Sequence, residues 1–233
     1  MWVEWAGEAH SDNSPLTLRP VAGSPAGLPQ DVVRFHTFTS IVVALGGEFE
    51  DPIANRGQGT FQTAIALYEG GYDVYMHDED DVNGQGFGAV YDEIVTAIRA
   101  RGVGGVAVFG YSHGGGSTFD LVNRLVLDRD AGRIVAFTIP FSAYVDAVTT
   151  GSVTQENRRP PSMYHANYYQ RGTEADFFLD GGPIPAAEAP AATTFQLDVE
   201  TRPWGLNTVH LEIDDLAQVI TGIHALLVPR VAR

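Results

Sequence analysis

Short apolar runs alternate along the chain with segments in which apolar residues recur every three or four positions. Apolar runs at residues 41–45 and 103–109 predict buried strands, because a strand covered on both faces needs apolar side chains throughout. Residues 72–76 are expected to form a further strand. Residues 59–69 and 87–101 have helical spacing, and glycine follows each segment. This alternation of strand and helix predicts a parallel sheet with helices on both faces.

The same alternation continues in the second half of the chain. Residues 117–127 are expected to form a helix, and residues 133–139 the strand that follows it. Later strands are predicted at residues 164–169 and 195–200, and a last helix is expected to open at Asp214. In such a sheet, reactive groups gather outside the carboxyl ends of the strands, so the search for a site starts there.

Length and segment boundaries predict one domain. Residues 1–30 are rich in Gly, Ser and Pro, and we expect them to be largely irregular. A chain of 233 residues that is 44% hydrophobic can bury one sizeable core, so residues 1–233 are expected to form a single domain. No segment between the predicted strands is long enough for a large helical cap. The predicted fold class is therefore α/β, with a mostly parallel central sheet flanked by helices on both faces.

Composition restricts the partners and the chemistry. The fourteen basic residues are all Arg and the formal net charge is −15, so the chain repels phosphate backbones and we expect no nucleic-acid binding. The absence of cysteine excludes disulfides and thiolate catalysis. No apolar stretch reaches eighteen residues, which predicts no transmembrane segment. The N-terminus lacks the pattern of a secretory signal, so we expect a cytoplasmic protein, with a mature secreted form as the alternative. The oligomeric state is left open.

The strongest chemical signal is a serine among glycines, directly after a predicted strand. Gly110-Tyr-Ser112-His-Gly114 matches the pattern G-x-S-x-G, and Ser112 stands at the point where the strand gives way to a helix. Such a turn projects the hydroxyl above the sheet, and glycines on either side are needed because neighbouring elements leave no room for a Cβ. The alternative is a glycine-rich turn with an incidental serine, and the position between strand and helix favours the catalytic interpretation.

The motif and the order of elements resemble the α/β-hydrolase superfamily, in particular its bacterial lipase-like and esterase-like members. The resemblance extends over most of the chain, from Ile41 to Leu227, and it implies the α/β-hydrolase fold. It also implies a serine nucleophile followed in the chain by an acid and then by a histidine. The resemblance identifies the superfamily better than it identifies the substrate.

Of the seven histidines, His210 fits the implied base best. It lies between the last predicted strand and the last predicted helix, which is where the superfamily carries its base. The others precede the serine, adjoin it, or fall within predicted strands or helices: His10, His36, His77, His113, His165 and His224. A hydroxyl is a weak nucleophile without such a base, and the base in turn needs an acid to orient it.

Two aspartates compete for the role of the acid. Asp146 could end the strand after the serine helix, a placement that some lipase-like relatives use, although Pro140 interrupts the strand expected there. Asp176 could follow the next strand, which is the commoner placement in the superfamily. We take Asp146 as the acid and keep Asp176 as the alternative.

The resemblance also implies two donors for an oxyanion. One is the backbone N–H of His113, the residue after the serine. The other is expected from the loop after the strand at residues 41–45, where Glu48 is favoured and Gly47 is the alternative. Relatives commonly carry His-Gly where this chain has Gly46-Gly47, so the loop departs from the usual pattern. Each donor typically contributes a few kcal/mol to the stability of the transition state.

Two further signals receive a structural interpretation. The acidic run Asp78-Glu-Asp-Asp81 could suggest a calcium or magnesium site, but four adjacent acids are more often a solvated loop, so we expect no metal. The glycines at residues 84–88 fit neither the dinucleotide fingerprint nor the P-loop, which also needs a Lys, and we expect no cofactor.

These observations predict a serine hydrolase that cleaves carboxylic esters through an acyl-enzyme on Ser112, with a small-molecule ester as substrate. Thioester hydrolysis, amide hydrolysis and acyl transfer would use the same residues. The rival from another class is a non-catalytic member of the fold that binds a ligand or a partner in its pocket. A fairly open pocket is expected, because no large cap covers it.

Overall fold

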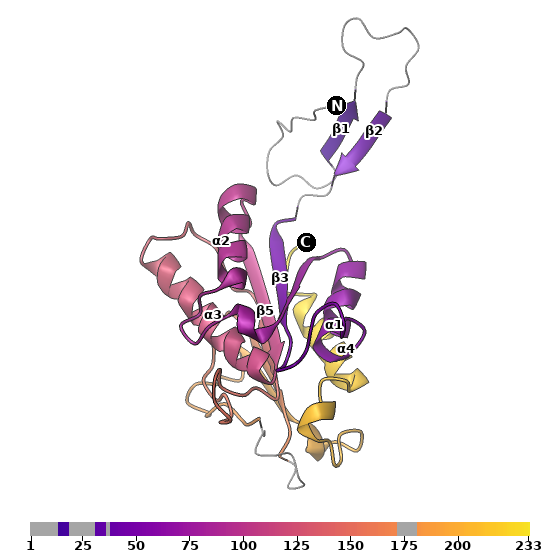
Figure 1. Cartoon of the computed structure of the whole chain (residues 1–233), viewed down its shortest axis with the longest axis vertical. Coiled ribbons are helices and arrows are strands. Elements are labelled where there is room, and N and C mark those ends of the chain that lie inside the picture. The colour runs from indigo at the N-terminus through magenta and orange to yellow at the C-terminus, as the bar shows by residue number, and fades with distance from the viewer. Residues whose placement is uncertain (1–13, 19–30, 36–37, 172–180) are drawn as a thin grey trace, which may run out of the picture.

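The computed structural model describes residues 14–18, 31–35, 38–171 and 181–233 (Figure 1). A six-stranded sheet has the order β4-β3-β5-β6-β7-β8, and every pair of neighbours in it is parallel. Its strands are β3 (Ser40–Leu45), β4 (Asp73–His77), β5 (Gly105–Tyr111), β6 (Ser142–Val145), β7 (His165–Tyr169) and β8 (Thr194–Asp198). The carboxyl ends of these strands therefore meet at one edge of the sheet.

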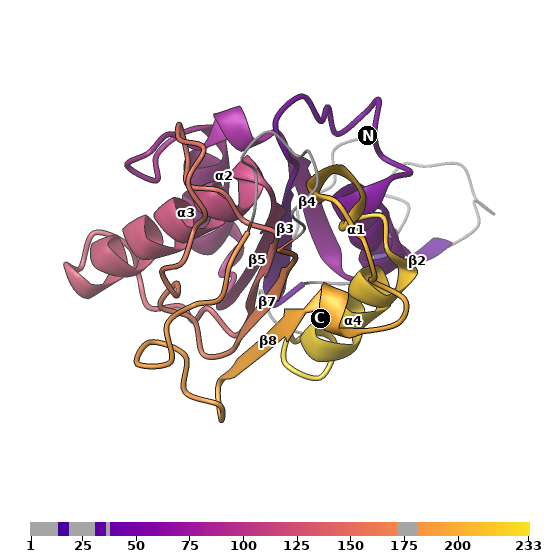
Figure 2. The same cartoon turned by 90° about the horizontal axis from the view of Figure 1, so that it is seen from below.

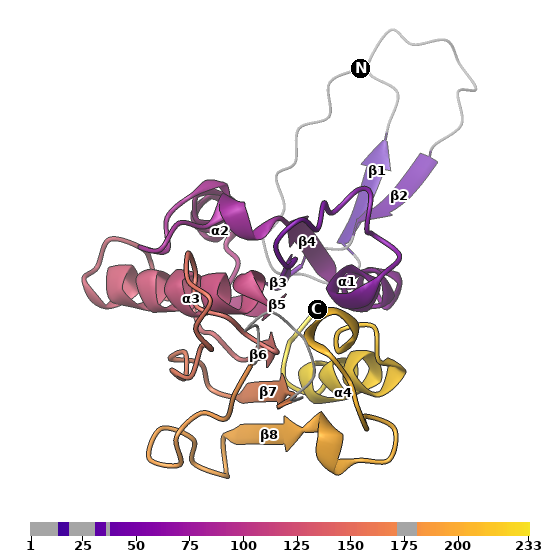
Figure 3. The same cartoon turned by 60° about the horizontal axis from the view of Figure 1, so that its bottom comes forward.

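Helices cover both faces of this sheet, as the sequence predicts. Figure 3 shows α1 and α4 on one face and α2 and α3 on the other. The helices are α1 (Gly59–Glu69), α2 (Ala89–Arg101), α3 (His113–Asp130) and α4 (Ala217–Leu227), and short 3₁₀ turns form η1 (Glu79–Asp81), η2 (Val199–Thr201) and η3 (His210–Glu212). Seen from below, the helices enclose the strands between two layers (Figure 2).

The alternation of side chains along β3 explains why its apolar run is continuous. Val42 and Ala44 pack in the core cluster that contains α1 and α4 residues, whereas Ile41, Val43 and Leu45 pack in the cluster that contains α2 and α3 residues. All five side chains are buried. Burying a Val, Leu or Ile side chain contributes roughly 1.5–3 kcal/mol, so both faces of this strand stabilise the sheet.

The strand after α3 is the clearest error of the sequence analysis. Residues 133–139 form no strand, apart from an isolated bridge between Thr138 and Gly105. The strand is β6, which begins at Ser142. Pro140 explains the displacement, because it has no N–H to give to a ladder and separates the bridge from the strand.

The N-terminal region contains a second, two-stranded antiparallel sheet, formed by β1 (Ser14–Leu18) and β2 (Asp31–Phe35). Residues 14–18 thus form a strand within the segment that was expected to be largely irregular, and the rest of residues 1–30 lies outside the described residues.

Within the described residues, no α-helix interrupts the connections from β6 to β7 and from β7 to β8, so no large helical cap lies there. No helix in the described part of the chain is long and apolar enough to cross a membrane. The single domain stays a prediction.

Candidate active site

Ser112 occupies a strained turn between β5 and α3. Its backbone angles are φ 52° and ψ −125°, a region that residues other than glycine rarely adopt. Two hydrogen bonds to the end of β6 hold this conformation: the N–H of Ser112 donates to the Val145 carbonyl at 3.0 Å, and its carbonyl accepts from the Val148 N–H at 2.9 Å. The neighbouring strand therefore fixes the position from which the hydroxyl projects.

The two motif glycines are required by close backbone contacts. A Cβ on Gly110 would lie 2.1 Å from the Gly114 carbonyl oxygen, and a Cβ on Gly114 would lie 2.2 Å from the Gly46 carbonyl oxygen. Both distances are far below a van der Waals contact, so a larger residue at either position would displace the turn. The reason that the sequence analysis gave for these glycines agrees with the geometry.

Ser112, His210 and Asp146 lie together at the carboxyl edge of the sheet. His210 follows β8 and opens η3, and Asp146 follows β6 directly. His210 Nε2 lies 2.8 Å from Ser112 Oγ, and His210 Nδ1 lies 2.8 Å from Asp146 Oδ2. In the tautomer whose Nδ1–H donates to Asp146, Nε2 accepts from the Ser112 hydroxyl. Asp176, the alternative acid, lies outside the described residues.

Ser112 has strained backbone angles at the end of a central strand of a parallel sheet. A histidine from the loop after the last strand contacts its hydroxyl. This combination is characteristic of one fold. The chain has the α/β-hydrolase fold. The resemblance stated for Gly110–Gly114 and for the order of elements is confirmed at the level of the fold.

Similarity to solved structures covers most of the chain at low sequence identity. Aspergillus fumigatus lipase B is 12% identical with a TM-score of 0.48, over 84% of this chain and 54% of the lipase chain. A cutinase-like protein from Cryptococcus sp. is 13% identical with a TM-score of 0.45, over 82% of this chain and 94% of the other. The matched part thus spans about half the length of lipase B. No model of a protein family matches the chain, and no curated protein matches it.

Asp146 is fully buried and surrounded by nitrogen donors. Its Oδ1 accepts from the backbone N–H groups of Gln170 and Gly181, and its Oδ2 accepts from Gln170 Nε2, each at 3.0 Å. His210 Nδ1 completes this set. The sequence analysis missed Gln170, although its position directly after β7 places it beside the end of β6. Such donors hold the oxygens of the carboxyl group in place.

Tyr111, the variable position of the motif before the serine, supports the His210 loop. Its hydroxyl donates to the His210 carbonyl at 2.8 Å, and the two rings stack with centroids 5.2 Å apart. Burial, followed by the negative charges of Asp214 and Glu50, raises the pKa of Tyr111, so its hydroxyl keeps its proton as a donor. The sequence analysis missed this contact because it joins residues 99 positions apart.

The loop after β3 lies against the serine. A Cβ on Gly47 would lie 3.2 Å from the Ser112 Cβ, so the backbone here is close to the nucleophile. The Gly47 N–H, however, donates to Glu50 Oε2 at 2.7 Å. Burial raises the pKa of Glu50, and the hydrogen bond from the Gly47 N–H acts in the opposite direction. The Gly47 amide is thus engaged within its own loop.

The side chain of His113 contacts the loops after β3 and β6. Its Nε2 donates to the Ser152 carbonyl at 2.8 Å, and its Nδ1 lies 3.2 Å from Glu48 Oε2. These contacts tie the start of α3 to the loops after β3 and β6. The sequence analysis assigned the role of His113 to its backbone N–H, and the ring contacts are compatible with that assignment.

Two acids behind His210 anchor its loop to α1. Asp215 Oδ1 accepts from the Gly59 N–H at 2.7 Å, and Asp214 Oδ2 accepts from the Thr60 N–H at 3.2 Å. Carboxylates are favoured at this end of a helix because its first N–H groups lack partners. Burial, and then the charges of Glu50 and Asp215, raise the pKa of Asp214 to about 8.

The acidic run at the end of β4 differs from the expected solvated loop. Glu79 belongs to η1 and is only 7% exposed. Burial, and then the neighbouring Asp78, raise the pKa of Glu79 to about 9. This run borders a cavity of about 290 Å³ that is also lined by His113 and Glu48, beside the serine turn.

Proposed function

We propose that the chain is a serine hydrolase that cleaves carboxylic esters. The observation that carries the proposal is the continuous hydrogen-bonded path from Ser112 Oγ through the His210 imidazole to Asp146, with 2.8 Å at each step. The three side chains are at most 4% exposed, so the path is shielded from competing water. A base within this distance of a hydroxyl, itself oriented by a carboxylate, is the arrangement that activates a serine.

In the proposed reaction, Ser112 Oγ attacks the ester carbonyl carbon while His210 Nε2 takes the hydroxyl proton. Asp146 keeps the imidazole in the tautomer that can accept this proton and stabilises the imidazolium that forms. The tetrahedral intermediate collapses as His210 returns the proton to the leaving alcohol oxygen, which leaves an acyl group on Ser112. Water then attacks the acyl-enzyme with His210 again as the base, and the carboxylic acid is released.

The proposed oxyanion donors are the backbone N–H groups of His113 and Glu48. His113 is the first residue of α3, so its N–H belongs to the helix end that attracts negative charge. Glu48 is preferred over Gly47 because the Gly47 N–H donates to Glu50. Glu50 thereby becomes a positioning residue that fixes the loop next to Ser112.

The proposed substrates are esters with small or medium apolar acyl groups. Loops that follow β3, β6 and β8 at the carboxyl edge of the sheet expose large apolar side chains, among them Phe49, Val153 and Leu211. Leu211 is the neighbour of His210, and Phe49 lines the cavity beside the serine turn. Such side chains lower the free energy of an apolar group that enters the site from water.

The test is hydrolysis of p-nitrophenyl butyrate by the wild type and by Ser112→Ala, with reactivity towards a fluorophosphonate probe measured in parallel. The wild type is expected to release nitrophenol and to gain the probe's mass once per chain. Ser112→Ala removes the nucleophile and is expected to lose both, with a rate loss of about 10⁴-fold or more.

Glu188→Gln is the matched control, because Glu188 is exposed on the loop before β8 and its substitution changes the surface alone. This variant is expected to keep wild-type turnover and labelling. A wild type that neither turns over the ester nor reacts with the probe would favour the non-catalytic binding protein instead. Turnover that survives in Ser112→Ala would contradict the role of this serine.

A further inference from the structure

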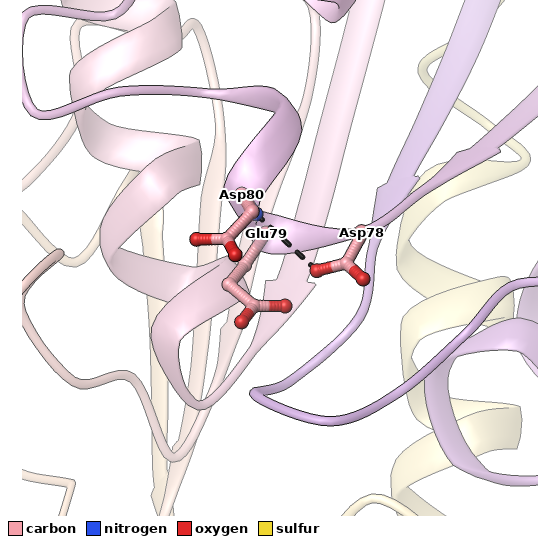
Figure 4. Close-up of side chains that lie close together, drawn as sticks. All are labelled: Asp78, Glu79 and Asp80. Carbon is pink, nitrogen blue, oxygen red and sulfur yellow. Dashed lines mark hydrogen bonds between the residues drawn. The ribbon is translucent and has the colours of Figure 1, made fainter.

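Three carboxyl groups gather where β4 ends. Asp78, Glu79 and Asp80 each offer an oxygen, and these oxygens all lie within 4.8 Å of one another (Figure 4). Two oxygens that bind one calcium ion at about 2.4 Å are at most about 4.8 Å apart. The spacing of the three groups therefore suits ligands of a single calcium ion.

Glu79 supplies a second, independent indication of a ligand. Its side chain is only 7% exposed, and its Oε2 is buried with no hydrogen-bond partner among the described residues. Figure 4 shows this carboxyl close to those of Asp78 and Asp80. A buried polar atom without a partner is unfavourable by about 1–3 kcal/mol, and a cation at this point would provide the missing partner.

The backbone around these groups is held in place. The Asp80 N–H donates to Asp78 Oδ1 at 3.3 Å, and the Ser117 hydroxyl of α3 donates to the Glu79 carbonyl at 3.2 Å. Fixed ligand positions reduce the entropy that a cation site must lose on binding.

The adjoining cavity leaves room for further oxygen ligands. Its volume is about 290 Å³, and its lining includes Glu48, Thr150 and Gly151 besides residues 78–80. Calcium needs six to eight oxygens, which carboxylates, carbonyls and water supply together. No Arg is among the described residues that line the cavity.

We propose that Asp78, Glu79 and Asp80 bind a calcium ion at the mouth of this cavity. The ion would join the end of β4 to the loops after β3 and β6, which line the same cavity. The site does not include Ser112, His210 or Asp146, so its existence is independent of ester hydrolysis. Its expected consequence is a more stable folded state in the presence of calcium.

The test measures the thermal midpoint and the heat of binding after the protein has been stripped with EDTA. Ten millimolar CaCl₂ is compared with MgCl₂ and with NaCl at equal ionic strength, because screening of a net charge of −15 alone stabilises the fold. A site with a dissociation constant of about 0.1–1 mM raises the midpoint by roughly 3–10 °C at this concentration. The calcium shift is expected to exceed both other shifts, with one ion bound per chain by calorimetry.

Glu79→Gln keeps the shape of the side chain and removes its charge, and it is expected to weaken calcium binding at least tenfold. Asp80→Asn is also expected to weaken calcium binding at least tenfold. Because Asp80 is exposed, this substitution is not expected to impair folding. Glu188→Gln, which removes one remote exposed charge, should retain the full calcium shift. Equal shifts in all four proteins, or a calcium shift no larger than that of matched NaCl, would overturn the proposal.

Discussion

Two buried carboxyl groups at the same edge of the sheet show opposite surroundings. Asp146 follows β6 with 0% exposure, and Glu79 follows β4 with 7% exposure. Nitrogen donors from Gln170, Gly181 and His210 converge on Asp146. Glu79 Oε2 has no such partner among the described residues, and burial raises the pKa of Glu79 to about 9.

The comparison teaches that burial alone does not determine the chemistry of an acid. Desolvation opposes the charge on any buried carboxyl, and only donors or cations offset it. The Asp146 carboxyl group has donors from the protein itself, which hold its oxygens in a fixed position beside His210 Nδ1. Glu79 Oε2 has no such partner among the described residues, so this oxygen is available to a partner from solution.

The largest effect is expected from Asp146→Asn. An amide at this position favours the wrong imidazole tautomer, so kcat for p-nitrophenyl butyrate should fall by about 10⁴-fold while the fold is kept. Asp176→Asn is the matched variant and should stay near the wild-type rate. Steady-state kinetics of both variants show which aspartate is the acid that orients His210. Comparable mild losses in the two would mean that neither aspartate has the proposed role.

A smaller effect is expected when one donor to Asp146 is removed. Gln170→Leu deletes the side-chain hydrogen bond to Oδ2 and leaves the backbone donor in place. We expect kcat to fall about tenfold with KM nearly unchanged, because a charge-assisted hydrogen bond contributes roughly 1.5–3 kcal/mol. The pH–rate profile should also shift, because the Asp146 carboxyl group beside His210 has lost one of its donors. An unchanged profile with a lower Tm would indicate a purely structural role.

Tyr111→Phe tests whether the Tyr111 hydroxyl helps to position His210. The substitution removes the hydrogen bond to the His210 carbonyl and keeps the stacked ring. Because a neutral hydrogen bond is worth about 1 kcal/mol, we expect a two- to fivefold loss in kcat/KM. Tyr111→Leu, which also removes the ring, should lose more. Equal activity in the three proteins would show that the contact does not position His210.

Asp214 is intermediate between Asp146 and Glu79. It accepts a hydrogen bond from the Thr60 N–H, and its pKa is raised to about 8. A carboxyl whose pKa is higher in the folded than in the unfolded state destabilises the fold as pH rises. For Asp214, the free energy of unfolding decreases between about pH 4 and pH 8, and the decrease is complete above about pH 8. Asp214→Asn should therefore gain about 1–2 kcal/mol over the wild type at pH 9 and nothing below pH 4. Urea unfolding at both values tests this, and a pH-independent difference would contradict it.

Local patterns were enough to predict the elements that place the site. The apolar run before Ser112 and the glycines around it predicted a strand and a sharp turn. Such a turn requires small residues at adjacent positions, so the sequence near Ser112 is enough to predict it. His210 was found through its place between the last strand and the last helix. These predictions depended on short-range sequence and on the element order of a known superfamily.

Long-range contacts explain what the sequence could not provide. Gln170 lies beside Asp146 because β7 pairs with β6, and Gly181 reaches Asp146 from the connection before β8. Nothing near Asp146 in the sequence indicates either contact. The strand expected at residues 133–139 was misplaced because its apolar pattern outweighed Pro140. Glu79 was read as solvated because its neighbours are charged, whereas packing against α3 buries it.

A crystal structure of the chain after reaction with a diethyl phosphonate probe tests the central claim most directly. The account predicts phosphorus bonded to Ser112 Oγ, His210 within hydrogen-bond distance of that oxygen, and the phosphoryl oxygen about 3 Å from the N–H groups of His113 and Glu48. Phosphorus on another residue, or a phosphoryl oxygen that points away from both amides, would contradict it.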